Sequence, residues 1–490
     1  MVMAMHVKLL YLNYIKLNNI FRLFLKILPL RFQILWNRIE VSNIGSRIAK
    51  GTFYSLSGAI ISRVLGLISS VIVARIIGKI GFGELGIIQS TIGMLGTMAG
   101  MGMGITATKY IAEYREIDKL KAGRIIHLSN VISFFFGLIM TIALFFSASW
   151  VAKNTLSAPT LSNPLKIGSI ILLFSSLVGA QNGILSGLES FKKITVINIW
   201  TGIATFPMML LGAYFFKLNG LIFALIGSQL FNLIINRFIL KKELLKFRIV
   251  PQRKGQFKVL NILWKYSLPA VLGGIVVSPI MWLGNAILVN QPNGYAEMGI
   301  FSAANQWRTA LMFIPTALMA SFLPIISNEN SNKQNFLKTF DYVHKINIIV
   351  ILPFFLIITI ISSFIMNLYG KSFGEGYLAL IVVIAATTIS GIGTPAGIAM
   401  QAKGKMWLGF IMNLSWGIVF SIAAYLFIPK FGALGLSLSF LVSYTFLTIW
   451  GYIYLKSFLS KKILLRTLFV ILIIIVCSMI MGLIHYQLNI

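Results

Sequence analysis

The sequence predicts an all-α protein that crosses a membrane many times. Of its 490 residues, 58% are hydrophobic and only 11% are charged, so too little polar surface is available for a soluble domain. The mean hydropathy is +0.88. Thirteen long apolar stretches divide the chain, each long enough for a spanning helix of about 20 residues. These stretches are continuously apolar and do not alternate, which favours helices over the strands of a barrel.

The expected spans follow these stretches in chain order. They are residues 50–76, 84–108, 125–150, 166–187, 194–216, 220–240, 262–289, 297–326, 343–368, 376–401, 406–428, 432–455 and 465–485. The connections between them are too short to hold a folded domain outside the membrane. We therefore expect a membrane protein that is not an enzyme.

The basic charge indicates how the chain is oriented. If the N-terminus is cytoplasmic and the spans alternate, most of the 42 Lys and Arg residues fall on the inner side. This bias is the positive-inside rule, and it predicts a multi-pass cell-membrane protein with a cytoplasmic N-terminus. The net charge of +31 then reflects topology and attraction to anionic membrane lipids, and no nucleic-acid partner is expected. The outer loops hold Lys79, Lys153, Lys166, Lys217, Lys371 and Lys430.

The chain is expected to divide into two membrane lobes with additions at both ends. Residues 1–45 mix cations with bulky apolar residues, which suits either an amphipathic segment on the inner leaflet or a poorly ordered extension. Residues 46–240 form the first six-helix lobe, and residues 262–456 form the second. The basic stretch 241–261 is predicted to link them in the cytoplasm, and residues 457–490 add a further C-terminal helix.

The two lobes carry a weak internal repeat. The stretch Gly81–Ile87 (GFGELGI) resembles Gly294–Ile300 (GYAEMGI) at an offset of 213. Further matches occur at an offset of 215. They pair Asn198, Gly202, Gly220 and Leu221 with Asn413, Gly417, Gly435 and Leu436. Six spans separate the copies, so the repeat is expected to be parallel, about an axis along the membrane normal. Chance similarity among apolar segments stays open as the alternative.

Small residues and prolines mark places where helices pack closely or bend. Four glycines fall on one face of the second span and are expected to allow close backbone approach. They are Gly93, Gly96, Gly100 and Gly104. In the seventh span, Pro269 and Pro279 free backbone carbonyls and suggest a flexible gate, with ordinary packing as the alternative.

Two arginines lie near the middle of a span and are the main candidate site residues. Arg63 follows Lys50 by 13 residues and precedes Arg75 by 12, which places it about 20 Å from either end of its helix. Arg308 lies in the eighth span, 11 residues after Glu297. A charge at such depth costs a few kcal/mol unless it faces a polar interior, so it is a functional candidate by default.

The missing acids point to the sign of the substrate. None of the 11 Asp and Glu residues is expected at mid-depth, which argues against a cation or proton site. The guanidinium of Arg63 and that of Arg308 suit the oxygens of a phosphate or diphosphate. The alternative is that each arginine satisfies helix carbonyls, or pairs with Glu84 or Glu297 near the outer ends of spans two and eight.

No metal or cofactor site is expected. Cys477 is the single cysteine, and the four histidines are scattered near span ends without a ligand motif.

The first spans resemble a known transporter superfamily. The stretches Ser62–Gly66 (SRVLG) and Val73–Gly78 (VARIIG), followed by Phe82–Gly83 and a glycine-rich span, resemble the MOP superfamily. Over about residues 46–456, the chain looks most like the Wzx-like polysaccharide transporters that flip O-antigen and teichuronic-acid precursors. The resemblance implies two six-helix bundles around a basic cavity that moves a polyprenyl-diphosphate-linked glycan. Glycosyltransferases and a glycan polymerase of the same pathway are the partners it implies.

Residue by residue, the resemblance assigns Arg63 to a cavity arginine of the first span and Arg308 to a similar position in the eighth. The chain departs from the related lipid II flippases, since Ser69 and Ser70 stand where those proteins have Arg and Asp. This departure favours a surface polysaccharide as the substrate.

Three other functions remain open at this point. A multidrug or metabolite exporter of the same superfamily would couple ions to the efflux of small cations. An integral membrane glycan polymerase or ligase would need catalytic residues on large outer loops, and the outer loops here are short. A membrane scaffold without transport activity would have no reason to bury two arginines.

Overall fold

A computed structural model describes the backbone of residues 43–253, 255, 268–328, 333–403, 405–457 and 459–487. The chain divides into two compact units, Met1–Tyr54 and Ser55–Ile490. The described part of the first unit is helical, and everything below concerns the second. The amphipathic or disordered segment expected at 1–45 therefore lies almost wholly outside the described residues.

Helices account for nearly all of the described chain, and no strand occurs within these ranges, which confirms the predicted all-α class. The α-helices are α3 (Asn43–Ala99), α4 (Met103–Tyr114), α5 (Lys119–Trp150), α6 (Ser162–Gly168), α7 (Ile170–Gly187), α8 (Phe191–Phe247), α9 (Leu268–Val289), α10 (Gly294–Asn328), α11 (Lys333–Ile360), α12 (Ser362–Tyr369), α13 (Tyr377–Ala402), α14 (Met406–Tyr454) and α15 (Lys461–Gln487). Short π or 3₁₀ segments are η1 (Val151–Thr155), η2 (Pro159–Leu161), η6 (Lys371–Gly376) and η7 (Leu455–Ser457). Among the described helices, eight are long and apolar enough to cross a membrane.

Three of these helices are long enough to cross twice, and each contains one residue with non-helical backbone angles. The bends lie at Gly78 in α3, Lys217 in α8 and Gly432 in α14. Each bend falls at or between the ends of two predicted spans, so α3, α8 and α14 each hold two of them. With these three helices divided, the predicted spans fall on helix over most of their described length, but the predicted span 84–108 is broken by a turn at residues 100–102, between α3 and α4. Helix α8 also runs to Phe247, so the start of the expected linker 241–261 is helical.

The bends in α8 and α14 have nearly the same conformation. Lys217 has φ 48° and ψ −127°, and Gly432 has φ 54° and ψ −125°. The two residues are 215 apart, which is the offset found in the sequence matches. Just beyond each bend a glycine packs against the preceding helix, Gly220 against the carbonyl of Gly212 and Gly435 against that of Phe427.

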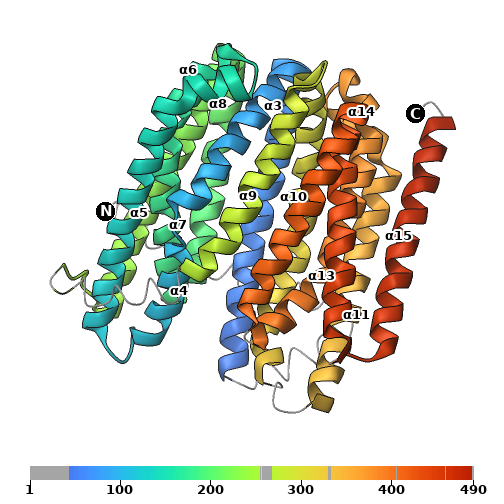
Figure 1. Ribbon diagram of the computed structural model, residues 1–490. Coiled ribbons are helices and arrows are strands. Elements are labelled where there is room, and N and C mark those ends of the chain that lie inside the picture. The colour runs from blue at the N-terminus through green and yellow to red at the C-terminus, as the bar shows by residue number, and fades with distance from the viewer. Residues whose placement is uncertain are drawn as a thin grey trace. The chain divides into compact units, whose positions relative to one another are not determined.

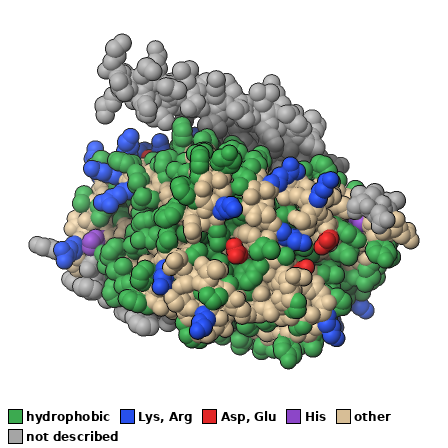
Figure 2. All heavy atoms as spheres, turned by 90° about the horizontal axis from the view of Figure 1, so that it is seen from above, with side chains coloured by type: hydrophobic (Ala, Val, Ile, Leu, Met, Phe, Trp, Pro, Cys, Tyr) green, Lys and Arg blue, Asp and Glu red, His purple; other side chains and the backbone are tan. Residues whose placement is uncertain are grey.

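The helices pack mainly within two groups (Figure 1). In the first group α7 packs against α4, α5 and α8. In the second, α13 packs against α10, α11 and α14, and α14 also packs against α9. Figure 2 views the molecule from the end at the top of Figure 1, where Lys and Arg side chains lie scattered among apolar ones and acidic side chains are few.

One set of contacts between the two groups lies at one end of the molecule. The Ser157 hydroxyl donates to Asn290 Oδ1 over 2.5 Å, and Asn290 Nδ2 donates to the Thr155 carbonyl over 2.7 Å. Tyr295 Oη donates to the Leu156 carbonyl over 2.7 Å. These residues follow α5 or lie between α9 and the first turn of α10, which is the outer end if the N-terminus is cytoplasmic. At that end, the two groups are therefore joined by direct hydrogen bonds.

Helix α15 packs against α11, α13 and α14 of the second group. Polar contacts hold α15 near both of its ends. Each contact links α15 to α11 or α12 and involves either a histidine or an ion pair. They are Thr467 Oγ1 with His344 Nε2 at 3.2 Å, Arg466 Nη1 with Asp341 Oδ1 at 2.7 Å, and Ser363 Oγ with His485 Nδ1 at 3.0 Å. His344 is fully buried and His485 nearly so. The extra C-terminal helix is thus attached to one group.

Candidate functional site

A cavity of about 280 Å³ lies where the two helix groups meet, and Arg308 is part of its wall. Residues of α3, α9, α10 and α14 line it. Its polar lining is neutral apart from the arginine. The neutral polar residues are Gln89, Ser90, Ser278, Asn285, Ser302, Asn305 and Gln306. A wall with one cation and no carboxylate favours an anionic or polar ligand.

Arg308 is held by its own helix and by α14. Its Nε donates to Asn305 Oδ1 over 2.6 Å, one turn earlier in α10. Its guanidinium carbon lies 5.0 Å from the centre of the Phe440 ring, a cation–π geometry. Arg308 forms no ion pair with any acid in the described chain. Its two terminal nitrogens therefore remain available to a ligand, which suits bidentate binding of phosphate oxygens.

Arg63 also reaches α10, but at a different face of that helix. Its Nη1 donates to the Thr309 carbonyl over 3.1 Å, and its guanidinium carbon lies 4.5 Å from the Phe313 ring centre. It has no acidic partner among the described residues either. Ser62 and Gly66, on either side of it in α3, line a second cavity of about 240 Å³.

The two arginines thus converge on one helix without lining one cavity. Arg308 lies in the wall of the first cavity, and Arg63 lies beside the second. The cavities adjoin, because Phe82, Gln89 and Gln306 are in the walls of both. In the described conformation Arg63 satisfies a helix carbonyl, which was the alternative considered for it from the sequence. A ligand held by both guanidiniums would have to displace that hydrogen bond.

Several buried polar atoms in this region have no hydrogen-bond partner within the described chain. Ser302 Oγ lies in the wall of the first cavity, and Ser69 Oγ and Thr201 Oγ1 lie in that of the second. Ser302 and Ser69 are more than nine-tenths buried. Buried polar atoms in proteins are nearly always paired with protein, water or ligand. The cleft is therefore built to receive polar groups.

The four glycines predicted to share one helix face lie in α3, in the turn after it and in α4, and three of them have no close neighbour. Gly93, Gly96, Gly100 and Gly104 line a third cavity of about 550 Å³ beside α7 and α8. A Cβ at Gly93 would meet nothing within 4 Å. Close backbone approach holds at Gly104, which packs against Gly183. Three of the four predicted packing glycines thus widen a cavity, because a residue without a side chain leaves space where no partner helix fills it.

Neither predicted pairing acid contacts an arginine of the site. Glu297 Oε2 accepts from the backbone N–H of Ala433 over 2.8 Å, at the start of the second half of α14. Glu84 lies near Tyr295 and forms no hydrogen bond or ion pair within the described chain. Pro279 lies inside α9, which continues through it to Val289. Pro269 lies in the first turn of α9.

The sequence reasoning missed the neutral polar residues of the cleft. Trp282 Nε1 donates to Thr91 Oγ1 over 2.9 Å, and Asn285 Nδ2 donates to Ser90 Oγ over 2.7 Å. Gln89 borders all three cavities. The available signal was the clustering of amides and hydroxyls on the faces of α3, α9 and α10 that also carry glycine.

With the geometry of the cleft described, comparison with known proteins identifies the family. A model of the family described as polysaccharide biosynthesis protein matches residues 48–329, more than half of the chain. The chain belongs to this family. It is 20% identical over 312 residues to the EPS I polysaccharide export inner membrane protein EpsE of Ralstonia solanacearum, covering 62% of this chain and 70% of that protein. It is 23% identical over 429 residues to the lipopolysaccharide biosynthesis protein WzxC of Escherichia coli (strain K12), covering 84% and 81%.

Solved structures show which fold this member of the polysaccharide biosynthesis family has. The chain is similar to the inward-facing conformation of a multidrug resistance MATE family transporter of the MOP superfamily, with a TM-score of 0.70. The match covers 83% of this chain and 98% of that transporter at 15% identity. The predicted all-α polytopic fold is therefore confirmed, and the protein is a multi-pass membrane protein. At this level of identity the likeness concerns the fold alone.

Proposed function

We propose that the protein is a flippase, which moves a lipid-diphosphate-linked oligosaccharide from the inner to the outer leaflet for surface polysaccharide synthesis. The observation that carries the proposal is Arg308, a cation in a cavity wall that holds no acid. The family membership supports a polysaccharide substrate, and the transporter fold supports movement across the membrane. In this proposal the substrate has an oligosaccharide headgroup, which a diphosphate joins to a polyprenyl carrier lipid.

The diphosphate would dock at Arg308, with Arg63 as the second cation. The terminal nitrogens of Arg308 have no partner in the described chain and offer the planar fork that binds phosphate oxygens in pairs. Arg63 lies 15 residues before Gly78, about 22 Å from the outer end of its helix. A carrier entering from the inner leaflet would exchange the Thr309 carbonyl for a phosphate oxygen at Arg63. An anion that neutralises both cations favours whichever state brings them closest.

Transport would follow from rocking of the two lobes, residues 46–240 and 262–456. Support comes from packing that is concentrated within each group, and from the matching bends at Lys217 and Gly432. Contacts between the groups at the outer end suit a state that is closed to the outside. Breaking these contacts and forming new ones at the inner end would expose the headgroup to the outer side.

The proposed orientation has the N-terminus in the cytoplasm. It is supported by the basic residues around the end of α4 and the start of α5, and by those that end α8. These residues are Arg115, Lys119, Lys121, Arg124, Lys241, Lys242 and Lys246. Glycosyltransferases that build the lipid-linked glycan would act before the flippase, and a glycan polymerase would act after it.

The test is surface glycan export in cells that lack the native gene. Arg308→Ala should reduce export at least tenfold, and Arg63→Ala should do the same, because each removes a cation that the diphosphate needs. Arg237→Ala is the matched control, since Arg237 is an exposed residue of α8 outside the cavities, and it should export normally. Membrane levels of each variant are compared by immunoblot, so that loss of protein is not mistaken for loss of transport.

Full export by Arg308→Ala at normal protein levels would reject the docking site. Accumulation of a fluorescent cationic drug in cells lacking the protein, with surface glycan unchanged, would instead favour the multidrug exporter.

A further inference from the structure

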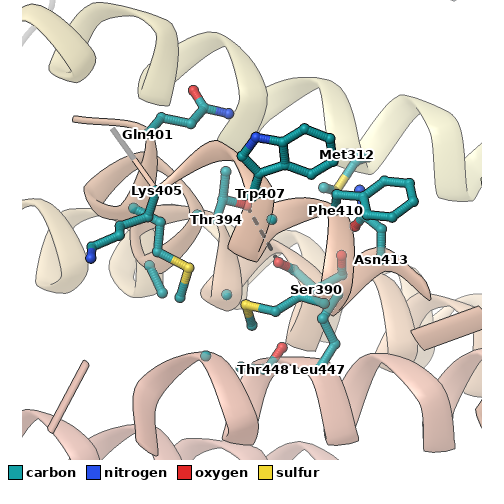
Figure 3. Close-up of a pocket in the computed structure, with 17 residues that line it drawn as sticks. Met312, Ser390, Thr394, Gln401, Lys405, Trp407, Phe410, Asn413, Leu447 and Thr448 are labelled. Atoms are coloured by element: carbon teal, nitrogen blue, oxygen red, sulfur yellow. Dashed lines mark hydrogen bonds between the residues drawn. The ribbon is translucent and has the colours of Figure 1, made fainter. Parts of the chain in front are cut away.

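A separate cavity of about 400 Å³ lies inside the second helix group, between α10, α13 and the two halves of α14 (Figure 3). We call it the C-terminal pocket. It shares no residue with the three cavities around Arg63 and Arg308. In Figure 3, Trp407 and Phe410 lie on one side of the hollow, Leu447 and Thr448 lie opposite, and Ser390 lies between them. Lys405 and Trp407, at the start of α14, put its mouth near the inner end.

Glycines create the space in this pocket. Gly397 and Gly409 are both in its wall, and a Cβ at either would meet nothing within 4 Å. Since a glycine inside a helix lowers its stability by roughly 0.5–1 kcal/mol relative to alanine, empty space beside two of them is not what packing alone favours. The empty space beside Gly397 and Gly409 is therefore present although these glycines lower the stability of α13 and α14.

The wall of the pocket also carries hydrogen-bonding groups that the protein leaves unused. The Asn413 amide, the Gln401 amide and the Ser390 hydroxyl donate to no atom of the described chain and accept from none. The Lys405 ammonium has no acidic partner there. Beside them, the indole of Trp407 is 66% exposed and packs edge-on against Phe410, with ring centres 6.0 Å apart. An aromatic surface next to free amides, a hydroxyl and a cation is typical of a small-molecule site.

This chemistry matches a sugar ring. A pyranose has C–H groups on its faces, which pack on an aromatic ring, and hydroxyls at its edge, which pair with amides and hydroxyls. Lys405 at the mouth adds a partner for an acidic substituent on the sugar. The cavity walls contain no carboxylate, so a cationic ligand is disfavoured.

The pocket also lies close to the proposed diphosphate site. Met312 in its wall is four residues after Arg308 on α10, on the same face and about 6 Å further inward. Leu447 in its wall is likewise seven residues after Phe440, the ring on which Arg308 rests. The same two helix faces therefore carry the cation and, one or two turns away, the pocket.

We infer that the C-terminal pocket holds the sugar residue next to the diphosphate of the lipid-linked glycan while the diphosphate rests on Arg308. This inference rests on the proposed function and adds a glycan-binding subsite to it. The pocket then selects carriers that have been glycosylated, and bare carrier lipid is held by the arginines alone.

The experiment compares two probes bound to the protein in lipid nanodiscs, measured by native mass spectrometry. One probe is the polyprenyl-diphosphate-linked oligosaccharide extracted from cells that carry the gene, and the other is the bare polyprenyl diphosphate. Gly397→Leu fills the pocket without a backbone clash and should weaken binding of the glycosylated probe at least tenfold. Binding of the bare probe should not change. Gly397→Ala is the matched control, since one methyl group leaves most of the space, and it should bind both probes like the wild type.

A second variant tests the hydrogen-bonding groups of the pocket rather than its volume. Asn413→Leu keeps a similar side-chain volume but removes the amide. It should weaken binding of the glycosylated probe and leave binding of the bare probe unchanged. Arg308→Ala should weaken binding of both probes. Ser415→Leu, two residues further along α14 and outside the pocket wall, is its control for folding and should bind as the wild type does.

The outcomes separate the two proposals. If Gly397→Leu and Asn413→Leu bind the glycosylated probe as the wild type does, the pocket is not a sugar site, and the flippase proposal stands. Equal loss of both probes in these variants would make the pocket a phosphate or lipid-headgroup site and overturn the inference. Wild-type protein that binds neither probe would reject the flippase proposal, and the sugar site with it.

Discussion

Charged side chains in this protein take different roles. Arg308 borders a cavity, Arg63 donates to a helix carbonyl, and Glu297 caps the backbone after the bend at Gly432. A carboxylate at the start of a helix pairs with backbone N–H groups that have no partner within the helix. Glu297 is therefore a structural residue by its contacts, in contrast to the two cations.

A substitution at Glu297 tests this role. Glu297→Ala should lower the free energy of unfolding by about 1 kcal/mol, because the N–H of Ala433 loses its acceptor. Glu297→Gln keeps a side-chain oxygen and should lose less than half of that. Thermal unfolding of the purified protein measures both variants. An equal loss for Gln and for Ala would show that the negative charge of Glu297, and not its acceptor oxygen alone, provides the stabilisation.

At the scale of single elements, the double-crossing helices depend on one residue each. A bend with positive φ and ψ near −125° belongs to a backbone region that is populated almost only by glycine and costs other residues about 1–3 kcal/mol. Gly432 meets this requirement, whereas Lys217 adopts nearly the same angles with a side chain. The first group of helices therefore holds backbone strain that the second group avoids.

Lys217→Gly should accordingly raise the free energy of unfolding by about 1 kcal/mol, since it relieves the strain. The reciprocal change, Gly432→Lys, should destabilise the protein by more, because its Cβ would also approach Glu297 Oε2 to 2.5 Å. Thermal unfolding of both variants provides the measurement. No stabilisation by Lys217→Gly would mean that the side chain of Lys217 contributes as much as its backbone costs.

At the scale of the whole molecule, the outer-end contacts offer a way to hold one state. Ser157 and Asn290 belong to different helix groups, and their side-chain oxygens are 2.5 Å apart. In a Cys477→Ser background, cysteines at these two positions should be joined by a short thiosulfonate cross-linker. Export should then fall at least tenfold, because the outer end cannot open, and reduction should restore it. Each single-cysteine variant, treated in the same way, is the control.

Undiminished export by the cross-linked protein would contradict rocking about a cleft that opens to the outside. It would leave the fold unaffected and require a path for the headgroup that avoids the outer end.

The sequence predicted most of the layout because spanning helices obey simple length and hydropathy rules. Position along a helix can also be predicted from the sequence, since each residue adds 1.5 Å, and so Arg63 and Arg308 were predicted to lie near the middle of their spans. The rotation of each helix about its own axis cannot be predicted from the sequence in this way. The face of α10 that Arg63 meets depends on how α3 and α10 pack, and that packing involves Phe313 and Thr309 from a distant part of the chain.

Glycine was the other source of error. A glycine is compatible with a close neighbour or with open space, and the sequence around Gly93 or Gly397 does not distinguish these. The predicted spans 194–216 and 220–240 placed a loop at Lys217, but the positive φ of that residue was not predicted, because lysine rarely adopts one. Gly432 lies 215 residues later and adopts nearly the same angles, and as a glycine it is compatible with them.

The attachment of α15 has a practical consequence. Hydrogen bonds between Thr467 and His344 and between His485 and Ser363 hold this helix to the second helix group, so we expect α15 to move together with that group. Tyr486 on α15 and Phe146 on α5 are 74% and 77% exposed, and neither is in the wall of the four cavities described above. A donor dye at one position and an acceptor dye at the other would report opening and closing of single molecules by energy transfer, with the substrate path left untouched.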